Sequence, residues 1–135
     1  MATILIVDDE ESIRDTLSAL VGNSGHLVWV AADGYEATRR FPEEQADLAI
    51  VDMIMPQKGG LETIAELRKM NPALKVIAVS GAAKVGRGRL LEWASRMGAD
   101  RVFSKPFVIS DILNAVTTLL REHQSEAARE NQVAR

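Results

Sequence analysis

Residues 48–60 read LAIVDMIMPQKGG, an apolar run that is closed by one carboxylate and a turn-forming segment. The run Leu48–Val51 is typical of a strand that is buried on both faces of a sheet. Asp52 follows it directly, and Pro56 and Gly59-Gly60 supply turn residues. We therefore expect a rigid strand to present Asp52 at its carboxyl end, which is the edge where ligands bind in open parallel sheets.

Four further apolar runs rich in Ile, Val and Leu indicate strands elsewhere in the chain. They are Ile4–Val7, Leu27–Val30, Val76–Val79 and Arg101–Phe103. The runs at 27–30 and 101–103 are the weaker ones, and we expect them at the two edges of the sheet.

Helical patterns separate the strands and lie at Glu11–Val21, Tyr35–Phe41, Leu61–Met70, Leu90–Met97 and Ser110–Arg121. Pro42 is expected to end the second helix, and Ser110 is a candidate N-cap of the last. Strict alternation of strand and helix predicts parallel strands joined by right-handed crossovers. The expected fold is α/β, a flavodoxin-like doubly wound sheet of five parallel strands, (βα)5, in the order 2-1-3-4-5.

The 135 residues suit one domain, which we place at residues 1–121, followed by a polar tail at 122–135 that extends the last helix or is disordered. With 47% hydrophobic and 26% charged residues the composition is that of a globular protein. The net charge is −3 and the basic residues are dispersed, which argues against direct nucleic-acid binding. There is no cysteine and no apolar run of about 20 residues. We expect a cytoplasmic protein without a membrane segment.

Chemistry-bearing residues follow the strands. Asp8 and Asp9 come after the first strand, while Ser80 and Lys105 come after the fourth and fifth. With Asp52, three carboxylates would gather at one edge and repel one another unless a cation lay among them. Hard divalent cations such as Mg²⁺ favour carboxylate oxygens, so the sequence indicates a metal site.

Four strings, in order, carry a resemblance to a known family: ILIVDDE (4–10), LAIVDMIMPQKGG (48–60), VIAVSG (76–81) and GADRVFSKPF (98–107). Together they resemble the receiver domains of two-component response regulators over roughly residues 3 to 121. The resemblance implies that Asp52 is the phosphoacceptor. It also implies that Asp8, Asp9, Asp52 and the backbone carbonyl of Ile54 hold Mg²⁺, with Mn²⁺ as an alternative.

The same resemblance gives roles to residues around the acceptor. Lys105 would donate its ammonium group to Asp52 and then to the phosphoryl group, and Pro106 would form a cis-peptide corner that aims this amine inward. Ser80 would hydrogen-bond a phosphoryl oxygen. Receiver domains usually carry an aromatic residue at the position of Val102, and Phe103 cannot replace it because adjacent strand residues face opposite ways.

Two further positions control access of the hydrolytic water in related domains. They are Ile54 and Ala82 here, and neither can orient water by hydrogen bonding. We therefore expect slow self-dephosphorylation. The basic, glycine-rich segment Lys84–Arg89 lengthens the connection between Ser80 and Lys105, and it is either a solvated connection or a partner contact.

The resemblance implies a histidine kinase or a histidine phosphotransfer protein as the donor. It also implies a changed surface around the fourth helix and fifth strand, which binds a downstream target protein or, in a longer chain, a C-terminal output domain. The protein would then not be an enzyme beyond slow self-phosphorylation from small donors and slow self-dephosphorylation. Without an aromatic residue at Val102, we expect the signal to pass through the fourth helix and its preceding loop.

Other interpretations of the same residues remain open. Asp8 and Asp9 could cap the first helix, Ser80 could cap a turn, and Lys105 could be solvated. A haloacid-dehalogenase-type phosphatase also starts from an aspartate after a strand, but it needs an acid/base Asp at the position of Ile54. A constitutive interaction module and a flavin or nucleotide binder are the remaining alternatives, although the chain lacks a phosphate-binding glycine loop.

Overall fold

A computed structural model describes residues 1–55, 57–81, 92, 96 and 98–133. Five parallel strands form one sheet in the order β2-β1-β3-β4-β5, as expected. The strands are β1 (Thr3–Val7), β2 (Leu27–Ala31), β3 (Leu48–Asp52), β4 (Lys75–Gly81) and β5 (Arg101–Lys105). The two weaker apolar runs form the edge strands β2 and β5, which have a neighbour on one side only.

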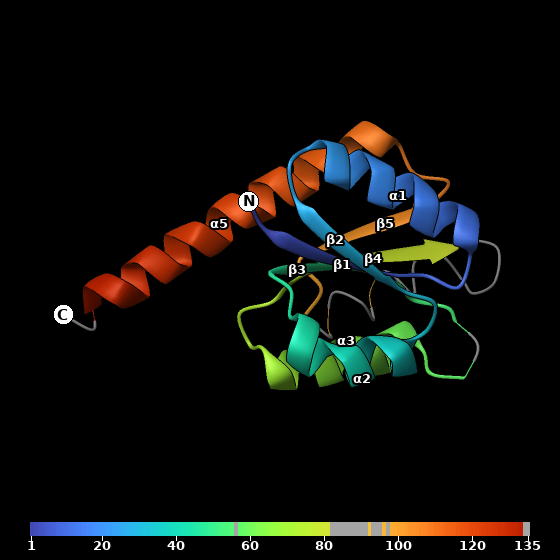
Figure 1. Cartoon of the computed structure of the whole chain (residues 1–135), viewed down its shortest axis with the longest axis horizontal. Helices are drawn as coiled ribbons and strands as arrows, with labels where there is room; N and C mark the ends of the chain where they lie inside the picture. Colours follow the sequence, from blue (N-terminus) through green and yellow to red (C-terminus); the bar gives the residue numbers. More distant parts are fainter. Residues whose placement is uncertain (56, 82–91, 93–95, 97, 134–135) are drawn as a thin grey trace.

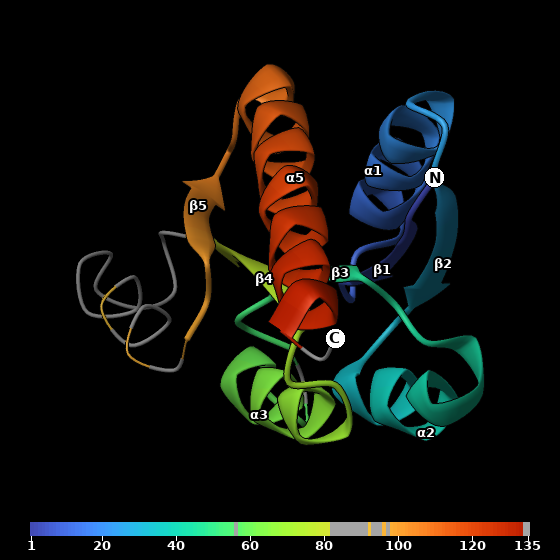
Figure 2. The same ribbon diagram turned by 90° about the vertical axis from the view of Figure 1, so that its left-hand side faces the viewer.

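Helices cover both faces of the sheet (Figures 1 and 2). Those described are α1 (Glu11–Asn23), α2 (Gly34–Glu44), α3 (Gly60–Met70) and α5 (Ile109–Val133). One face carries α1 and α5, and the other carries α2 and α3. The helix expected at 90–97 and the basic segment 84–89 lie largely or wholly outside the described residues. Across the part of the chain that is described, no helix combines the length and the apolar character that a membrane crossing requires.

The core is two apolar layers, one on each side of the sheet. Successive residues of β1 alternate between them: Leu5 packs with Phe41 and Ile64 on the α2–α3 side, while Ile6 packs with Leu17 on the α1–α5 side. This alternation explains why the strands read as continuous apolar runs. It also leaves their carboxyl ends as the place where polar side chains are exposed to solvent or to a ligand.

We expected Pro42 to end α2, but the helix continues to Glu44. At this position the missing N–H removes only one hydrogen bond near the helix end. The buried Phe41 anchors the final turn. The chain leaves the helix at Gln45, whose φ of 56° lies in the left-handed region and whose N–H donates to the Phe41 carbonyl at 2.9 Å.

Ser110 is not the N-cap of α5, which corrects a second expectation. The helix begins one residue earlier, at Ile109. The carbonyl of Val108 accepts hydrogen bonds from the N–H groups of Asp111 (3.0 Å) and Ile112 (3.3 Å). The carbonyl of Val108 therefore makes the first hydrogen bonds of the helix, and Ser110 lies exposed within the first turn.

The helix α5 continues through the polar segment after residue 121 and projects beyond the sheet (Figure 1). Its side chains contact residues at the amino edge of the sheet before they leave the domain. Glu126 pairs with Lys75 at 2.9 Å, and His123 lies 3.6 Å from Asp47. These contacts fix the direction in which the helix leaves.

Candidate functional site

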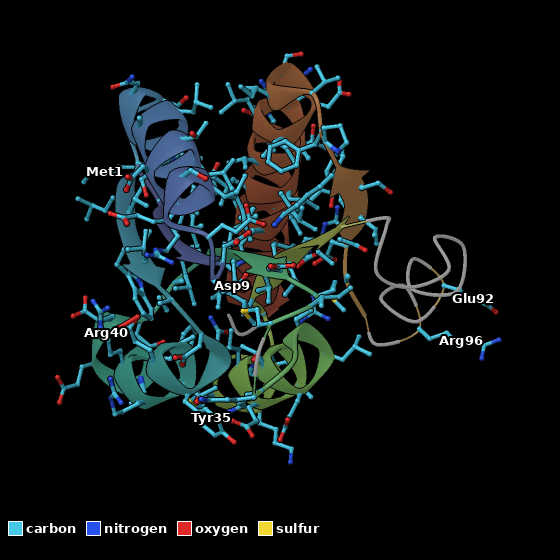
Figure 3. All side chains as sticks on the ribbon, turned by 90° about the vertical axis from the view of Figure 1, so that its right-hand side faces the viewer. Met1, Asp9, Tyr35, Arg40, Glu92 and Arg96 are labelled. Carbon is cyan, nitrogen blue, oxygen red and sulfur yellow. The ribbon has the colours of Figure 1, made fainter. Side chains whose placement is uncertain are left out.

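The carboxylates of Asp8, Asp9 and Asp52 meet at the carboxyl edge of the sheet. β1 and β3 are paired with Val7 opposite Val51, so the residues that follow lie side by side. One oxygen from each carboxylate lies within 4.8 Å of the others. Asp8 and Asp52 are buried, whereas Asp9 is exposed and lies near the centre of the view onto this edge (Figure 3).

Asp8 is held by contacts on both of its oxygens. The backbone N–H of Glu10 donates to Oδ1 at 2.9 Å, and the ammonium group of Lys105 donates to Oδ2 at 3.0 Å. The carboxylate does not cap α1, whose N-cap residue is Glu10. This geometry favours a role in the acidic cluster over the simple helix cap that the sequence left open.

Lys105 reaches the site from the end of β5. Its Nζ lies 3.0 Å from Asp8, 3.5 Å from Asp52 and 3.6 Å from Glu10. Its peptide bond to Pro106 is cis, as the resemblance implied. The lysine is mostly buried, so the solvated-lysine interpretation does not fit. Its shortest contact is to Asp8 and not to the expected acceptor.

The pKa of Asp52 is raised to about 7, mainly because burial disfavours its charged form and secondly because Asp8 is negative. The N–H of Ile54, which donates to Asp52 Oδ1 at 3.1 Å, and the charge of Lys105 only partly offset these effects. Burial lowers the pKa of Lys105, but the hydrogen bond to Asp8 and the charges of Asp52 and Asp8 raise it overall. The pKa values of Asp52 and Lys105 are thus set jointly by burial and by the charges that face each other at this edge.

The residues present fit a hard divalent cation. Three carboxylate oxygens lie close enough to share one ion, and the negative charge of Asp8 is one of the causes that raise the pKa of Asp52. Oxygen donors with several open positions are the set that Mg²⁺ takes when it also keeps water molecules. Asp8, Asp9 and Asp52 would hold the ion.

Ser80 is buried near the end of β4, one residue after Val79. β4 pairs with β3 so that Val79 faces Asp52, and the N–H of Met53 donates to the Val79 carbonyl at 2.8 Å. Ile54 is partly buried and packs against the α2–α3 core layer. Ala82, the other position for which the resemblance implies control of water access, lies outside the described residues.

Val102 and Phe103 face opposite sides of the sheet, which agrees with the expectation from strand geometry. Val102 packs with the α2–α3 layer and Phe103 with the α1–α5 layer. Phe103 therefore does not occupy the place of the missing aromatic residue.

Two residues of the site were not identified from the sequence. Glu10 contributes a third carboxylate to Lys105, and the guanidinium group of Arg14 donates to the carbonyl oxygen of Asp8 at 2.8 Å. The position of Glu10 directly after Asp8-Asp9 was a usable signal. No sequence signal pointed to Arg14, because its contact with Asp8 arises only when the first turn of α1 packs against the end of β1.

Comparison with known proteins agrees with this geometry. Residues 4–117 match the family described as response regulator receiver domain. The chain is 30% identical over 132 residues to the response regulator MprA of Mycobacterium bovis, covering 98% of this chain and 56% of that protein. It thus spans about half the length of the curated relatives that it matches.

Solved structures are similar over nearly the whole chain. A CheY-like receiver domain protein from Methanospirillum hungatei superposes with a TM-score of 0.85 at 29% identity, covering 93% of this chain and 98% of that one. NtrX from Brucella abortus, solved in complex with ATP, gives a TM-score of 0.88 at 26% identity, covering 97% of this chain and 29% of that one. The chain belongs to the response regulator receiver domain family of two-component signalling.

Proposed function

We propose that Asp52 accepts a phosphoryl group from a histidine kinase or a histidine phosphotransfer protein in a Mg²⁺-dependent reaction. The observation that carries the proposal is the meeting of Asp8, Asp9 and Asp52 with Lys105 at the carboxyl edge of the sheet. Such a donor would place the reaction in the cytoplasm.

The geometry suits nucleophilic attack by a carboxylate. A bond forms between an Asp52 oxygen and phosphorus while the bond between phosphorus and the donor's histidine nitrogen breaks, and the electron pair leaves with that nitrogen. The N–H of Ile54 orients Asp52 by its hydrogen bond to Oδ1. Bound Mg²⁺ would offset negative charge on the reacting oxygens.

Lys105 and Ser80 would hold the product. The ammonium group of Lys105 is already 3.5 Å from Asp52 and can donate to a phosphoryl oxygen. Ser80, next to Val79, would donate its hydroxyl from β4. The partly buried, apolar side chain of Ile54 supplies no acid or base for rapid hydrolysis, which disfavours the phosphatase alternative.

Phosphorylation would alter the surface around the fourth helix and β5, and this surface would bind a target protein or an output domain. Since Val102 lacks a ring, we propose that the signal passes through the fourth helix and its preceding loop. Crystal structures with and without a phosphoryl mimic test this route. An identical loop in both structures would disprove it.

The acceptor is tested by incubation with acetyl phosphate and Mg²⁺, followed by intact mass measurement. The wild-type protein should gain the mass of one phosphoryl group, and EDTA should prevent the gain. Asp52→Asn should show none, while Asp47→Asn, a carboxylate at the opposite edge of the sheet, should behave as wild type. A gain that persists in Asp52→Asn would refute the assignment.

A further inference from the structure

An open hollow lies between α2 and α3, away from the acidic site. It has a volume of about 600 Å³ and is lined by residues at matching i, i+3 and i+4 positions of the two helices: Tyr35, Thr38, Arg39, Glu66, Lys69 and Met70. The apolar stripes of these helices are buried against the sheet, whereas Tyr35 is 54% and Met70 is 40% exposed. In Figure 3, Tyr35 lies on the outer side of this helix pair.

A buried lysine contacts several of the residues that line the hollow. Lys58, in the loop between β3 and α3, is only 3% exposed, and lysines are rarely so buried unless they are paired. Its ammonium group donates to Thr38 Oγ1 at 3.1 Å, forms an ion pair with Glu66 and lies 5.2 Å from the ring centre of Tyr35. Three of the six lining residues are thus held in place by one cation before any ligand binds.

The rim of the hollow is positively charged. Lys58 neutralises Glu66, the one acidic residue of the lining. Arg39 and Lys69 are exposed, and neither makes an ion pair with any residue that the structure describes. This local charge is opposite in sign to the net charge of −3 of the whole chain. Complementary charge steers association and selects the partner.

We propose that the hollow between α2 and α3 is a docking surface for an acidic segment of a partner protein. A large apolar side chain of that segment would lie against Tyr35 and Met70, and its carboxylates would pair with Arg39 and Lys69. Aromatic residues, Met and Arg are the residue types enriched at such interfaces. The six lining residues are few beside the roughly 20 to 30 that each partner contributes to a stable protein pair, which favours a short segment over a second copy of the chain.

The test is a titration of the ¹⁵N-labelled, unphosphorylated chain with a short amphipathic peptide of Glu, Leu and Ala, followed by NMR. Backbone shifts should map to α2 and α3 and should shrink as salt rises, because screening weakens the charge contacts. The same peptide with Lys in place of Glu should bind about tenfold more weakly or not at all. The titration is independent of whether Asp52 is phosphorylated.

Variants separate the hollow from general charge effects. Arg39→Glu and Lys69→Glu should each weaken binding about tenfold, while Arg121→Glu on α5 makes the same charge change elsewhere and should not alter it. Lys58→Met should weaken binding by about threefold, because it leaves Glu66 unneutralised in the hollow.

Lys75→Met is the matched control for Lys58→Met, since Lys75 is a second buried lysine paired with an exposed glutamate, at the amino edge of the sheet. It should leave binding unchanged. The proposal is wrong if both peptides bind equally, if Arg39→Glu and Lys69→Glu bind as wild type, or if the shifts map outside α2 and α3. A dimer in sedimentation that Arg39→Glu dissociates would assign the hollow to a second copy and would equally overturn it.

Discussion

At the scale of one residue, the burial of the Asp52 carboxyl group beside Asp8 works against stability once that group is charged. Its pKa is raised from 3.8 to about 7 by burial and by Asp8, so the folded state binds its proton more tightly than the unfolded state does. The free energy of unfolding therefore falls as pH rises through the window from about 4 to 7. Above that window the charged side chain destabilises the metal-free fold.

Replacing this charge should stabilise the metal-free protein. In EDTA at pH 8, Asp52→Asn should raise the free energy of unfolding by about 1 kcal/mol, or roughly 3 to 6 °C in melting temperature. The gain should shrink towards pH 4, and Mg²⁺ should reduce it at pH 8. Asp15→Asn removes an exposed carboxylate from α1 and should show neither effect. A melting temperature of Asp52→Asn equal to wild type at pH 8 would contradict the argument.

The side chain of Ile54 leads to a second prediction at the scale of one residue, on the lifetime of the phosphoryl group. Its apolar side chain cannot hold an attacking water molecule, so the phosphoryl group of the wild type should last well beyond seconds. Ile54→Asn adds hydrogen-bonding groups at this position and should shorten the lifetime about tenfold. Ile54→Val keeps the site apolar and should leave the lifetime unchanged. The decay is followed by intact mass after removal of the donor, and a wild-type half-life of seconds would refute the prediction.

At the scale of elements, the start of α3 is pressed against the end of β3. A Cβ on Gly60 would lie 2.4 Å from the carbonyl oxygen of Asp52 and 2.6 Å from the Cα of Met53, both backbone atoms. A Cβ on Gly22, within α1, would meet nothing within 4 Å. The close approach therefore requires a glycine at position 60, whereas the surroundings of Gly22 leave room for a side chain.

Alanine should separate them in thermal unfolding. Gly60→Ala should destabilise the fold by about 2 to 3 kcal/mol, because the backbone that carries Asp52 must move, and it should also lower the rate of phosphorylation. Gly22→Ala should stabilise α1 by about 0.5 to 1 kcal/mol. Equal effects of the two substitutions would show that the contact at Gly60 is relieved at little cost.

The elements also show what the sequence can and cannot predict. Strands such as Leu48–Asp52 were predicted well because burial on both faces demands a continuous apolar run. The end of α2 was not, because Pro42 is tolerated where the buried Phe41 anchors the last turn. In the site, the positions of Asp8, Asp9 and Asp52 at one edge could be predicted because each follows a parallel strand, and their roles came from the family resemblance. The contact of Arg14 with Asp8 depends on how a helix packs back on its strand, and the sequence does not encode this locally.

At the scale of the molecule, α5 divides into a packed part and a projecting part. Up to residue 129, the last position at which burial is described, its buried residues end at Leu120. Glu126 pairs with Lys75 at the opposite edge of the sheet from Asp52. The receiver unit proposed at residues 1–121 should therefore fold and accept a phosphoryl group without the remainder of the helix. Truncation nevertheless leaves the ammonium group of Lys75, which is only 8% exposed, without its carboxylate partner.

A chain that ends after Arg121 should thus keep its acetyl phosphate-dependent mass gain but lose about 1 to 3 kcal/mol of stability. Adding Lys75→Met to this shortened chain should recover much of the loss, because the stranded charge is gone and the apolar stem is kept. In the full chain, the same substitution should not stabilise. Thermal unfolding of the four proteins measures this coupling, and additive effects would show that the pair with Glu126 does not fasten α5 to the sheet.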